Sequence, residues 1–274
     1  MQNIRRTERL SCITRMLVGE PNKTFSLSQF CDAFNAAKST ISEDLDIIRT
    51  SLSRFSLGTL ETLPGAAGGV RFRPTVSHEA GYAYVKDLCR QLSNPGRVLP
   101  GGLLYLSDII ADPQRIGQMG AMLASEYFSA APDFVLTMET QGIPLAMMTA
   151  QALCVPVLIA RRSSKAYEGS TVHVPYLSGA QFKTMSLSRK LVHPGQRALI
   201  VDDVLRSGGT AKGMFDLMRE FSAEVVGAAM LVSTEEASDS FHFIKPLMIL
   251  EKADEATGTA TLHPGDWLRQ QHIS

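Results

Sequence analysis

Apolar residues recur three and four positions apart through the first 55 residues, a spacing that predicts amphipathic helices. The first predicted helix covers 5–18 and the second covers 27–34. A third helix begins at Ser39 or Thr40, and its buried stripe consists of Ile41, Leu45, Ile48 and Leu52. The pattern therefore predicts three short helices packed around one small core.

Capping signals mark the starts of the second and third helices. Ser26 or Ser28 can accept a hydrogen bond from the first turn of the second helix. Thr40 and Glu43 have the spacing of a capping box, and Asp44 also lies near the positive end of the helix dipole. We expect both helices to begin at these polar residues.

A glycine-rich turn follows the third helix and separates two short stretches with strand character. The stretches are 57–63 and 70–74, and the turn between them is 64–69. In a strand, alternate side chains point to opposite faces, so Arg71 and Arg73 share the outward face. This segment is predicted to be a β-hairpin.

Three helices followed by a hairpin are typical of a winged helix, and the second and third helices have the helix-turn-helix arrangement. The expected partner is duplex operator DNA, with basic side chains on phosphates and small polar side chains near the bases. The candidate DNA-binding residues are Arg5, Arg6, Lys38, Ser39, Thr40, Ser42, Gly68, Gly69, Arg71 and Arg73. The alternative interpretation is a small helical dimerisation domain with a hairpin.

The pattern changes after a linker at 74–77. The predicted elements are helix 78–92, strand 103–106, helix 116–128, strand 134–138, helix 143–153, and strands 156–160, 198–201 and 225–232. Alternating strands and helices at this spacing predict an α/β fold with a doubly wound parallel sheet. We therefore expect two domains, a winged helix over 1–74 and an α/β domain over 75–274.

Two adjacent carboxylates, Asp202 and Asp203, close the apolar run 198–201. Ligands of open parallel sheets bind beyond the carboxyl ends of the strands, and paired carboxylates there can accept hydrogen bonds from a ribose diol. The turn that follows opens a helix, where glycines and free N–H groups can bind a phosphate. Its residues are Ser207, Gly208, Gly209 and Thr210, with Arg206 facing the same pocket. The alternative is an ordinary strand–turn–helix with solvated aspartates.

Two further segments are candidates for the same site. The loop 137–144 joins a strand to a helix, and its Thr140, Gln141 and Gly142 can present backbone N–H groups to an anion. A connection of 35 residues precedes the strand at 198, and its alternating pattern over 168–190 predicts a flap with a turn at Ser178 and Gly179. Flap residues that could reach a ligand are Lys165, Tyr176 and Lys183.

Composition and charge place the chain among ordinary globular proteins, with 45% hydrophobic and 20% charged residues and a net charge of zero. Residues 1–75 hold ten Lys and Arg against seven Asp and Glu, so the first part is basic and the rest acidic. The four cysteines are widely separated, which favours reduced thiols and argues against a zinc site. We expect a cytoplasmic protein with no metal site and no membrane partner.

The stretch VDDVLRSGGT resembles the phosphoribosyl diphosphate (PRPP) signature of type I phosphoribosyltransferases. The resemblance implies that Asp202 and Asp203 bind the ribose hydroxyls, that 207–210 bind the 5-phosphate and that 140–142 bind the diphosphate. Gln141 stands where that family more often has Lys or Arg. This departure weakens the electrostatic case for catalysis on a departing diphosphate.

The whole chain resembles bacterial purine operon regulators through KSTISEDLDII, LPGAAGGVRF, LPGGLLYLSDI, EGSTVHVPYLSG and TMSLSRK. That resemblance implies a homodimeric transcription factor, most often a repressor of purine biosynthesis genes, that senses PRPP, with or without Mg²⁺, and lacks transferase activity. It also implies that a guanosine tetraphosphate-type alarmone can compete for the pocket. The alternative function is an active purine or pyrimidine phosphoribosyltransferase with an accessory N-terminal domain.

Overall fold

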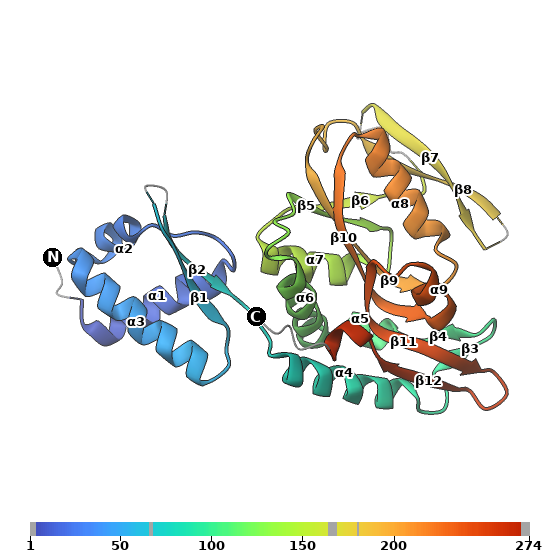
Figure 1. Ribbon diagram of the computed structural model, residues 1–274, viewed down its shortest axis with the longest axis horizontal. Coiled ribbons are helices and arrows are strands. Elements are labelled where there is room, and N and C mark those ends of the chain that lie inside the picture. The colour runs from blue at the N-terminus through green and yellow to red at the C-terminus, as the bar shows by residue number, and fades with distance from the viewer. Residues whose placement is uncertain (1–3, 66–67, 164–168, 180, 270–274) are drawn as a thin grey trace. The chain divides into compact units, whose positions relative to one another are not determined.

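The computed structural model describes residues 4–65, 68–163, 169–179 and 181–269 (Figure 1). The chain divides into two compact units. The first comprises Met1–Ser77 together with Gln151–Cys154, and the second comprises His78–Ala150 and Val155–Ser274. Each unit has its own cluster of buried apolar side chains.

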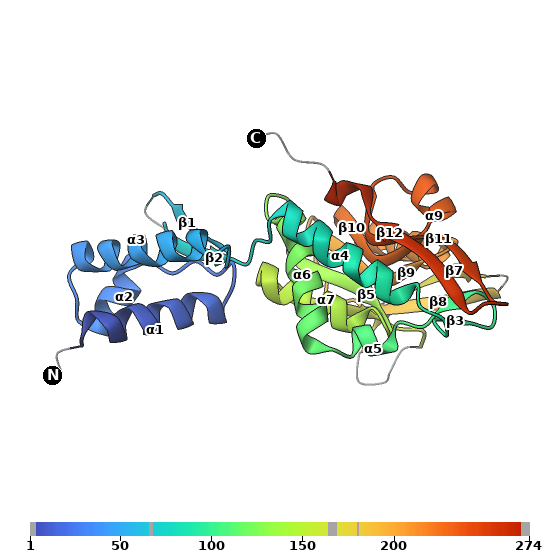
Figure 2. The same cartoon turned by 90° about the horizontal axis from the view of Figure 1, so that it is seen from below.

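The first unit contains three helices and a two-stranded antiparallel hairpin (Figures 1 and 2). The helices are α1 (Arg6–Gly19), α2 (Leu27–Phe34) and α3 (Lys38–Arg54), and the strands are β1 (Thr59–Leu63) and β2 (Gly69–Arg73). All five elements contribute to one core, whose fully buried members include Ile13, Leu17, Phe30 and Ile41. The predicted winged helix is confirmed as an arrangement of elements.

The helix starts agree with the sequence pattern at α2 and differ from it at α3. Ser26 caps α2, because its Oγ accepts a hydrogen bond from the Gln29 N–H at 3.3 Å. Helix α3 begins at Lys38 with Ala37 at the cap position and no side-chain cap. The predicted capping box of Thr40 and Glu43 was therefore wrong, since both residues already lie inside the helix.

Asp44 has a different role from the one predicted for it. Its side chain is fully buried, and its two carboxylate oxygens accept hydrogen bonds from Arg6 Nε at 3.0 Å and Arg9 Nε at 2.6 Å. A buried charge is tolerated only when it is paired in this way. Asp44 thus joins α3 to α1 and is not a solvated partner of the helix dipole.

The second unit is built on a six-stranded sheet in the order β12-β11-β10-β9-β5-β6. Its strands are β5 (Phe134–Met138), β6 (Val157–Ala160), β9 (Arg197–Leu205), β10 (Glu224–Thr234), β11 (Ile244–Asp254) and β12 (Thr259–Pro264). Neighbours pair in parallel except for β12, which is antiparallel to β11. The predicted doubly wound α/β class is confirmed, with one antiparallel edge strand added by the tail.

The remaining elements surround this sheet (Figure 1). The helices are α4 (His78–Leu92), α5 (Ser107–Ile110), α6 (Pro113–Tyr127), α7 (Ile143–Leu153), α8 (Gly209–Glu220) and α9 (Glu235–Ser240), with a 3-10 turn at Asp266–Leu268. Two hairpins stand apart from the sheet, β3 (Val98–Leu99) with β4 (Leu103–Leu104), and β7 (Thr171–Ser178) with β8 (Gln181–Ser188). The predicted strand over 103–106 therefore belongs to a small hairpin. None of the helices in the described segments is long and apolar enough to cross a membrane.

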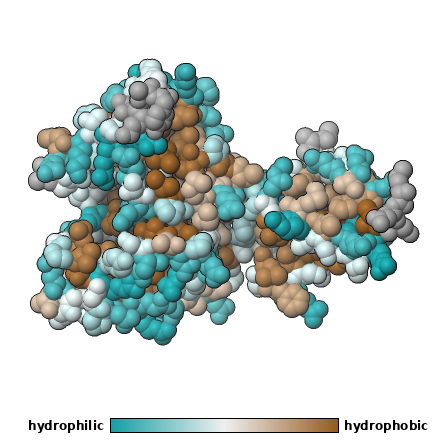
Figure 3. Space-filling model, turned by 180° about the vertical axis from the view of Figure 1, so that it is seen from behind, coloured by the Kyte–Doolittle hydropathy of each residue, from teal (hydrophilic) through white to brown (hydrophobic). Residues whose placement is uncertain are grey.

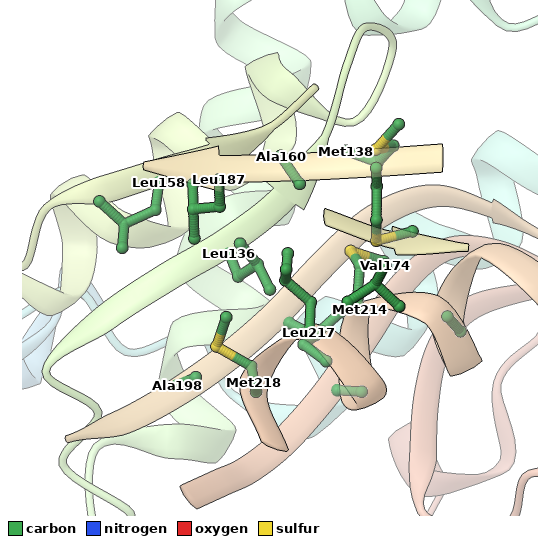
Figure 4. Packing of buried hydrophobic residues seen from close by; sticks show 14 of the residues in the cluster. Leu136, Met138, Leu158, Ala160, Val174, Leu187, Ala198, Met214, Leu217 and Met218 are labelled. Carbon is green, nitrogen blue, oxygen red and sulfur yellow. The ribbon is translucent and has the colours of Figure 1, made fainter. Parts of the chain in front are cut away.

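Strand β9 and helix α8 both contribute to the core of the second unit. Ala198, Leu199, Ile200 and Val201 have no exposed surface, as expected of a strand covered on both faces. Helix α8 packs its Met214, Leu217 and Met218 against this region (Figure 4). Some large apolar side chains stay exposed, and Figure 3 shows apolar surface on both units.

Strand β9 is longer than the sequence predicted. It pairs with β5 only as far as Ile200, but it continues along β10 to Leu205. Asp202 and Asp203 therefore lie within the strand and do not follow its end. On the β5 side the ladder has already stopped, and this leaves room for the loop that begins α7.

Candidate functional site

Asp202 lies just beyond the point where the β5–β9 ladder ends. Strand β5 and the loop between β5 and α7 enclose its side chain. Only 6% of the residue is exposed. Thr137 Oγ1, from β5, donates a hydrogen bond to Asp202 Oδ1 at 3.4 Å. A Cβ added to Gly142 would lie 2.0 Å from the same oxygen, so only glycine fits there. Gly142 thus allows the loop to close over the carboxylate.

The acidic pair is electrostatically strained. Burial raises the pKa of Asp202 well above its usual range, and the neighbouring Asp203 charge raises it further. Burial also raises the pKa of Asp203, against the opposing effects of backbone N–H groups and of the Arg162 charge. Groups that can donate hydrogen bonds to both carboxylates, such as a vicinal diol, would relieve this strain.

The glycine loop positions the N-terminus of α8 beside the acidic pair. Gly208 has a φ of +73°, and a Cβ there would lie 2.2 Å from the Phe241 ring. A Cβ on Gly209 would lie 1.8 Å from the carbonyl oxygen of Leu177, in the flap hairpin. Because the first-turn N–H groups of a helix have no intrahelical acceptor, this end can bind an anion.

These residues line one cavity of about 650 Å³. Its polar lining includes Gln141, Ser178, the acidic pair and residues of the loop from Arg206 to Thr210. Its apolar lining includes Leu99, Leu103, Leu104, Tyr105, Leu106, Met230, Val232 and Leu250. The cavity therefore combines paired carboxylates, a helix N-terminus and apolar side chains within one space.

The structure brings together most of the site residues predicted in this unit. Asp202, Asp203, Arg206, Ser207, Gly208, Gly209, Thr210 and Gln141 all line the cavity. Thr140 is exposed and is not part of the lining, and Gly142 contributes through its contact with Asp202. Arg206 Nη2 donates a hydrogen bond to the Gly101 carbonyl at 3.2 Å, which connects the glycine loop to the turn of the β3–β4 hairpin.

The predicted flap contains the hairpin of β7 and β8, and among its described residues the cavity is lined at the turn. Ser178 and Gly179 line the cavity, and Lys183 Nζ donates to Ser178 Oγ at 3.4 Å. Tyr176 is buried in the core against α8, so its side chain is not presented to a ligand. Lys165 lies outside the described residues.

Two groups near the site were missed by the sequence reasoning. The segment 99–107 forms an apolar wall of the cavity through Leu99, Leu103, Leu104, Tyr105 and Leu106, and no local pattern in the sequence marked it as part of the site. Arg162 follows β6, its backbone N–H donates to Glu139 Oε1 at 2.7 Å, and its charge favours the ionised form of Asp203. The position of Arg162 just after a parallel strand was the signal for it.

The first unit presents the start of α3 to solvent. Lys38, Ser39 and Ser42 are exposed, and Thr40 is half-buried. No ion pair involving Lys38 occurs among the described residues. Arg6 differs, because it pairs with Asp44 and with Glu43 at 3.4 Å. The predicted DNA-binding residues of this region thus include both an unpaired cation and a paired one.

The hairpin of the first unit carries its glycines where the chain is crowded. A Cβ on Gly68 would lie 2.2 Å from the Leu63 carbonyl oxygen, and one on Gly69 would lie 2.1 Å from that of Phe25. Arg71 and Arg73 point away from the core, as expected, because the alternating residues Val70 and Phe72 are buried. Residues 66–67 at the tip of this hairpin lie outside the described residues.

Comparison with known proteins agrees with this two-part organisation. Residues 5–74 match the family described as bacterial purine repressor, N-terminal, and residues 107–244 match the phosphoribosyl transferase domain. The purine biosynthesis transcriptional repressor PurR of Bacillus subtilis (strain 168) is 42% identical over 233 residues, which cover 84% of this chain and 82% of that protein. The chain belongs to the bacterial purine repressor family. The resemblance noted in the sequence is thereby confirmed.

Other similar proteins include a second regulator and two enzymes. The purine biosynthesis transcriptional activator PurR of Lactococcus lactis subsp. lactis is 38% identical over 84% of this chain and 85% of its own length. The xanthine phosphoribosyltransferase of Exiguobacterium sp. is 32% identical, but over only 54% of this chain and 80% of the enzyme. The adenine phosphoribosyltransferase of Thermoanaerobacter pseudethanolicus has a TM-score of 0.53 at 20% identity, covers 60% of this chain and 98% of the enzyme, and shows the fold alone.

Proposed function

We propose that this purine repressor family member regulates transcription of purine biosynthesis genes by binding operator DNA through residues 5–74. We further propose that PRPP, bound in the cavity of the second unit, changes the affinity for that DNA. Relatives are named both as repressors and as an activator. We propose repression here, because residues 5–74 match a family described as a repressor domain.

The observation that carries the PRPP proposal is the placement of two unlike subsites in one cavity. The acidic pair on β9 suits the ribose hydroxyls, and the N-terminus of α8 suits the 5-phosphate. Five residues of chain, 204–208, separate Asp203 from the first residue of α8 at Gly209, so one short segment positions both subsites. We propose that the diphosphate extends toward Gln141, which lines the cavity, and toward the backbone at Gly142 beside it.

Magnesium would have to arrive with the ligand. No group of three or more His, Cys, Asp or Glu side chains in the described segments could hold a metal ion. Asp202 and Asp203 supply carboxylate oxygens, which Mg²⁺ prefers, and the diphosphate of PRPP would supply the others. We therefore propose Mg²⁺ only as a companion of PRPP.

The enzyme alternative rests on the similarity to xanthine phosphoribosyltransferases. Against it, Gln141 provides hydrogen bonds but no positive charge where negative charge would develop on a leaving diphosphate. Consumption of PRPP should be measured with adenine, guanine, xanthine, hypoxanthine, uracil and orotate. Turnover with any of these bases would support the enzyme and contradict a sensor without catalytic activity.

The regulatory proposal is tested by linkage between the two ligands. The protein is first used to capture fragments of genomic DNA from the organism that encodes it, and the enriched sequence then serves as the operator. Operator affinity is measured with and without PRPP at fixed salt and magnesium, with a coupling of about 5- to 150-fold expected. By reciprocity, the operator must change PRPP affinity by the same factor. Equal affinities in both conditions would contradict regulation by PRPP.

Two further parts of the proposal have separate measurements. A homodimer would double the mass found by light scattering and would favour an operator with two related half-sites. Guanosine tetraphosphate carries phosphates on a ribose, so it is proposed to compete for the same cavity. Competition would raise the apparent dissociation constant of PRPP in proportion to the alarmone concentration, and independence of the two would contradict a shared site.

A further inference from the structure

The outer face of the wing hairpin carries one carboxylate between two arginines. Glu61 on β1 lies directly opposite Arg71 on β2 in the strand register. Arg71 Nε donates a hydrogen bond to Glu61 Oε2 at 2.6 Å, and Arg73 Nη1 lies 3.3 Å from the same oxygen. One acidic oxygen thus binds both arginines through which the wing would contact DNA phosphates.

This cluster is held more firmly than a typical surface ion pair. The side chains of Glu61, Arg71 and Arg73 are 35%, 21% and 18% exposed. Arg73 Nε also donates to Asn22 Oδ1 at 3.3 Å, outside the hairpin. The hydrogen bond from Arg71 lowers the pKa of Glu61, so the carboxylate stays ionised at neutral pH.

A DNA phosphate competes with Glu61 for the same guanidinium groups. To contact Arg71, a phosphate must either displace the carboxylate or approach while that negative charge stays nearby. Both routes reduce the stabilisation that an unpaired arginine would give, since like charges repel and broken hydrogen bonds must be replaced. The three charged groups together offer one net positive charge instead of two.

We propose that Glu61 attenuates the sequence-independent affinity of the wing for DNA by neutralising Arg71 and Arg73. The inference rests on the proposed DNA-binding function of this unit. Binding then depends more on Lys38 and the exposed start of α3, where bases can be recognised. Glu61 therefore favours discrimination between operator and other DNA over tight binding to any duplex.

The test is binding of a fluorescein-labelled mixed-sequence duplex of about 30 base pairs, a length that exceeds a typical half-site spacing. The full-length protein and its Glu61→Gln variant are titrated by fluorescence anisotropy across a range of KCl concentrations, without PRPP. Each additional phosphate that the protein neutralises adds about 0.9 to the slope of log K against log salt, or about 8-fold in affinity near 0.1 M. We expect Glu61→Gln to bind about 8-fold tighter with a steeper slope.

Two controls separate attenuation from a general charge effect. Asp32→Asn removes the same charge from an exposed position on α2 that makes no ion pair with the described residues, and it should have a smaller effect. Arg71→Gln should weaken binding in both backgrounds, but more in Glu61→Gln, where no carboxylate competes for the guanidinium, than in the parent protein, where Glu61 accepts its hydrogen bond. This non-additivity is the double-mutant signature of a neutralised pair.

The outcomes separate this inference from the proposed function. If Glu61→Gln binds no tighter than Asp32→Asn, or binds more weakly than the parent, attenuation is wrong and Glu61 orients the arginines for binding. If the parent shows no salt-dependent DNA binding, the proposed function itself fails. Folding of each variant is checked by circular dichroism, and Glu61→Thr, which suits a strand, replaces Glu61→Gln if that variant does not fold.

Discussion

Replacing Asp202 by Asn should stabilise the protein while damaging its binding site. The buried carboxylate has a raised pKa, so the folded protein is penalised for keeping this group ionised. An acid with a raised folded-state pKa carries no penalty below its unfolded pKa, and the penalty grows as the pH rises toward the folded pKa. Asparagine has nearly the same shape, cannot ionise and can still accept the hydrogen bond from Thr137.

The size of the effect follows from the linkage between pKa and stability. Each unit by which burial and Asp203 raise the pKa of Asp202 corresponds to about 1.4 kcal/mol of lost stability at neutral pH. For a folding unit of this size, 1 kcal/mol shifts the melting temperature by about 2–4 °C. We therefore expect Asp202→Asn to melt several degrees higher at pH 7.5, with the difference shrinking toward pH 5 and absent below about pH 4.

The assay is scanning calorimetry of the parent and variant between pH 4 and pH 8, accompanied by PRPP titration at pH 7.5. Asp254→Asn is the matched control, because Asp254 is only half-buried and backbone hydrogen bonds from Thr257 and Ala256 lower its pKa. Removing that charge should not raise the melting temperature. An Asp202→Asn variant that melts lower at pH 7.5, or whose added stability does not change with pH, would refute the account of the acidic pair.

Three other predictions test separate parts of the molecule. Asp203→Ala should weaken PRPP binding by about 10- to 150-fold, as expected from the loss of a charge-assisted hydrogen bond of about 1.5–3 kcal/mol. If calorimetry shows unchanged PRPP affinity in the Asp202→Ala, Asp203→Ala double variant, the assignment of the ribose hydroxyls to these carboxylates is wrong. Lys38→Gln should lower the salt slope of DNA binding by about 1 and weaken all sequences alike, whereas a change confined to the operator would mean that Lys38 contacts bases. Gly209→Ala should reduce both PRPP affinity and melting temperature, because the added methyl would meet the Leu177 carbonyl and overpacking costs about 1–3 kcal/mol; a variant with parent-like values would show that the flap and α8 are free to separate.

Local patterns predicted the elements where the chain's own spacing determines them. The predicted stripe of α3 at Ile41, Leu45, Ile48 and Leu52 is buried, and β5 and α7 have the expected bounds. The cap of α2 followed the polar pattern as well. The cap of α3 did not, because the turn after α2 places Lys38 in helical geometry before the polar residues begin.

Longer-range features could not be inferred from local spacing. The burial of Asp44 depends on Arg9, which lies 35 residues earlier and on another helix. The extension of β9 beyond Val201 depends on its partner β10, whose last residues continue the ladder after β5 has ended. The apolar wall at 99–107 could not be assigned to the site, since its local sequence does not indicate which strands it packs near in the fold.

The flap hairpin also affects the protein's resistance to aggregation. Strand β6 is an outer strand of the sheet and only four residues long, so one side of its backbone has no neighbouring strand in the sheet. Just beyond β6, Arg161 pairs with Ser186 of β8 through reciprocal backbone hydrogen bonds of 2.9 and 2.7 Å. The hairpin thereby occupies the position at which a strand from another molecule could begin to pair. Shortening the hairpin to simplify the binding site would consequently expose that edge and promote association between partly folded chains.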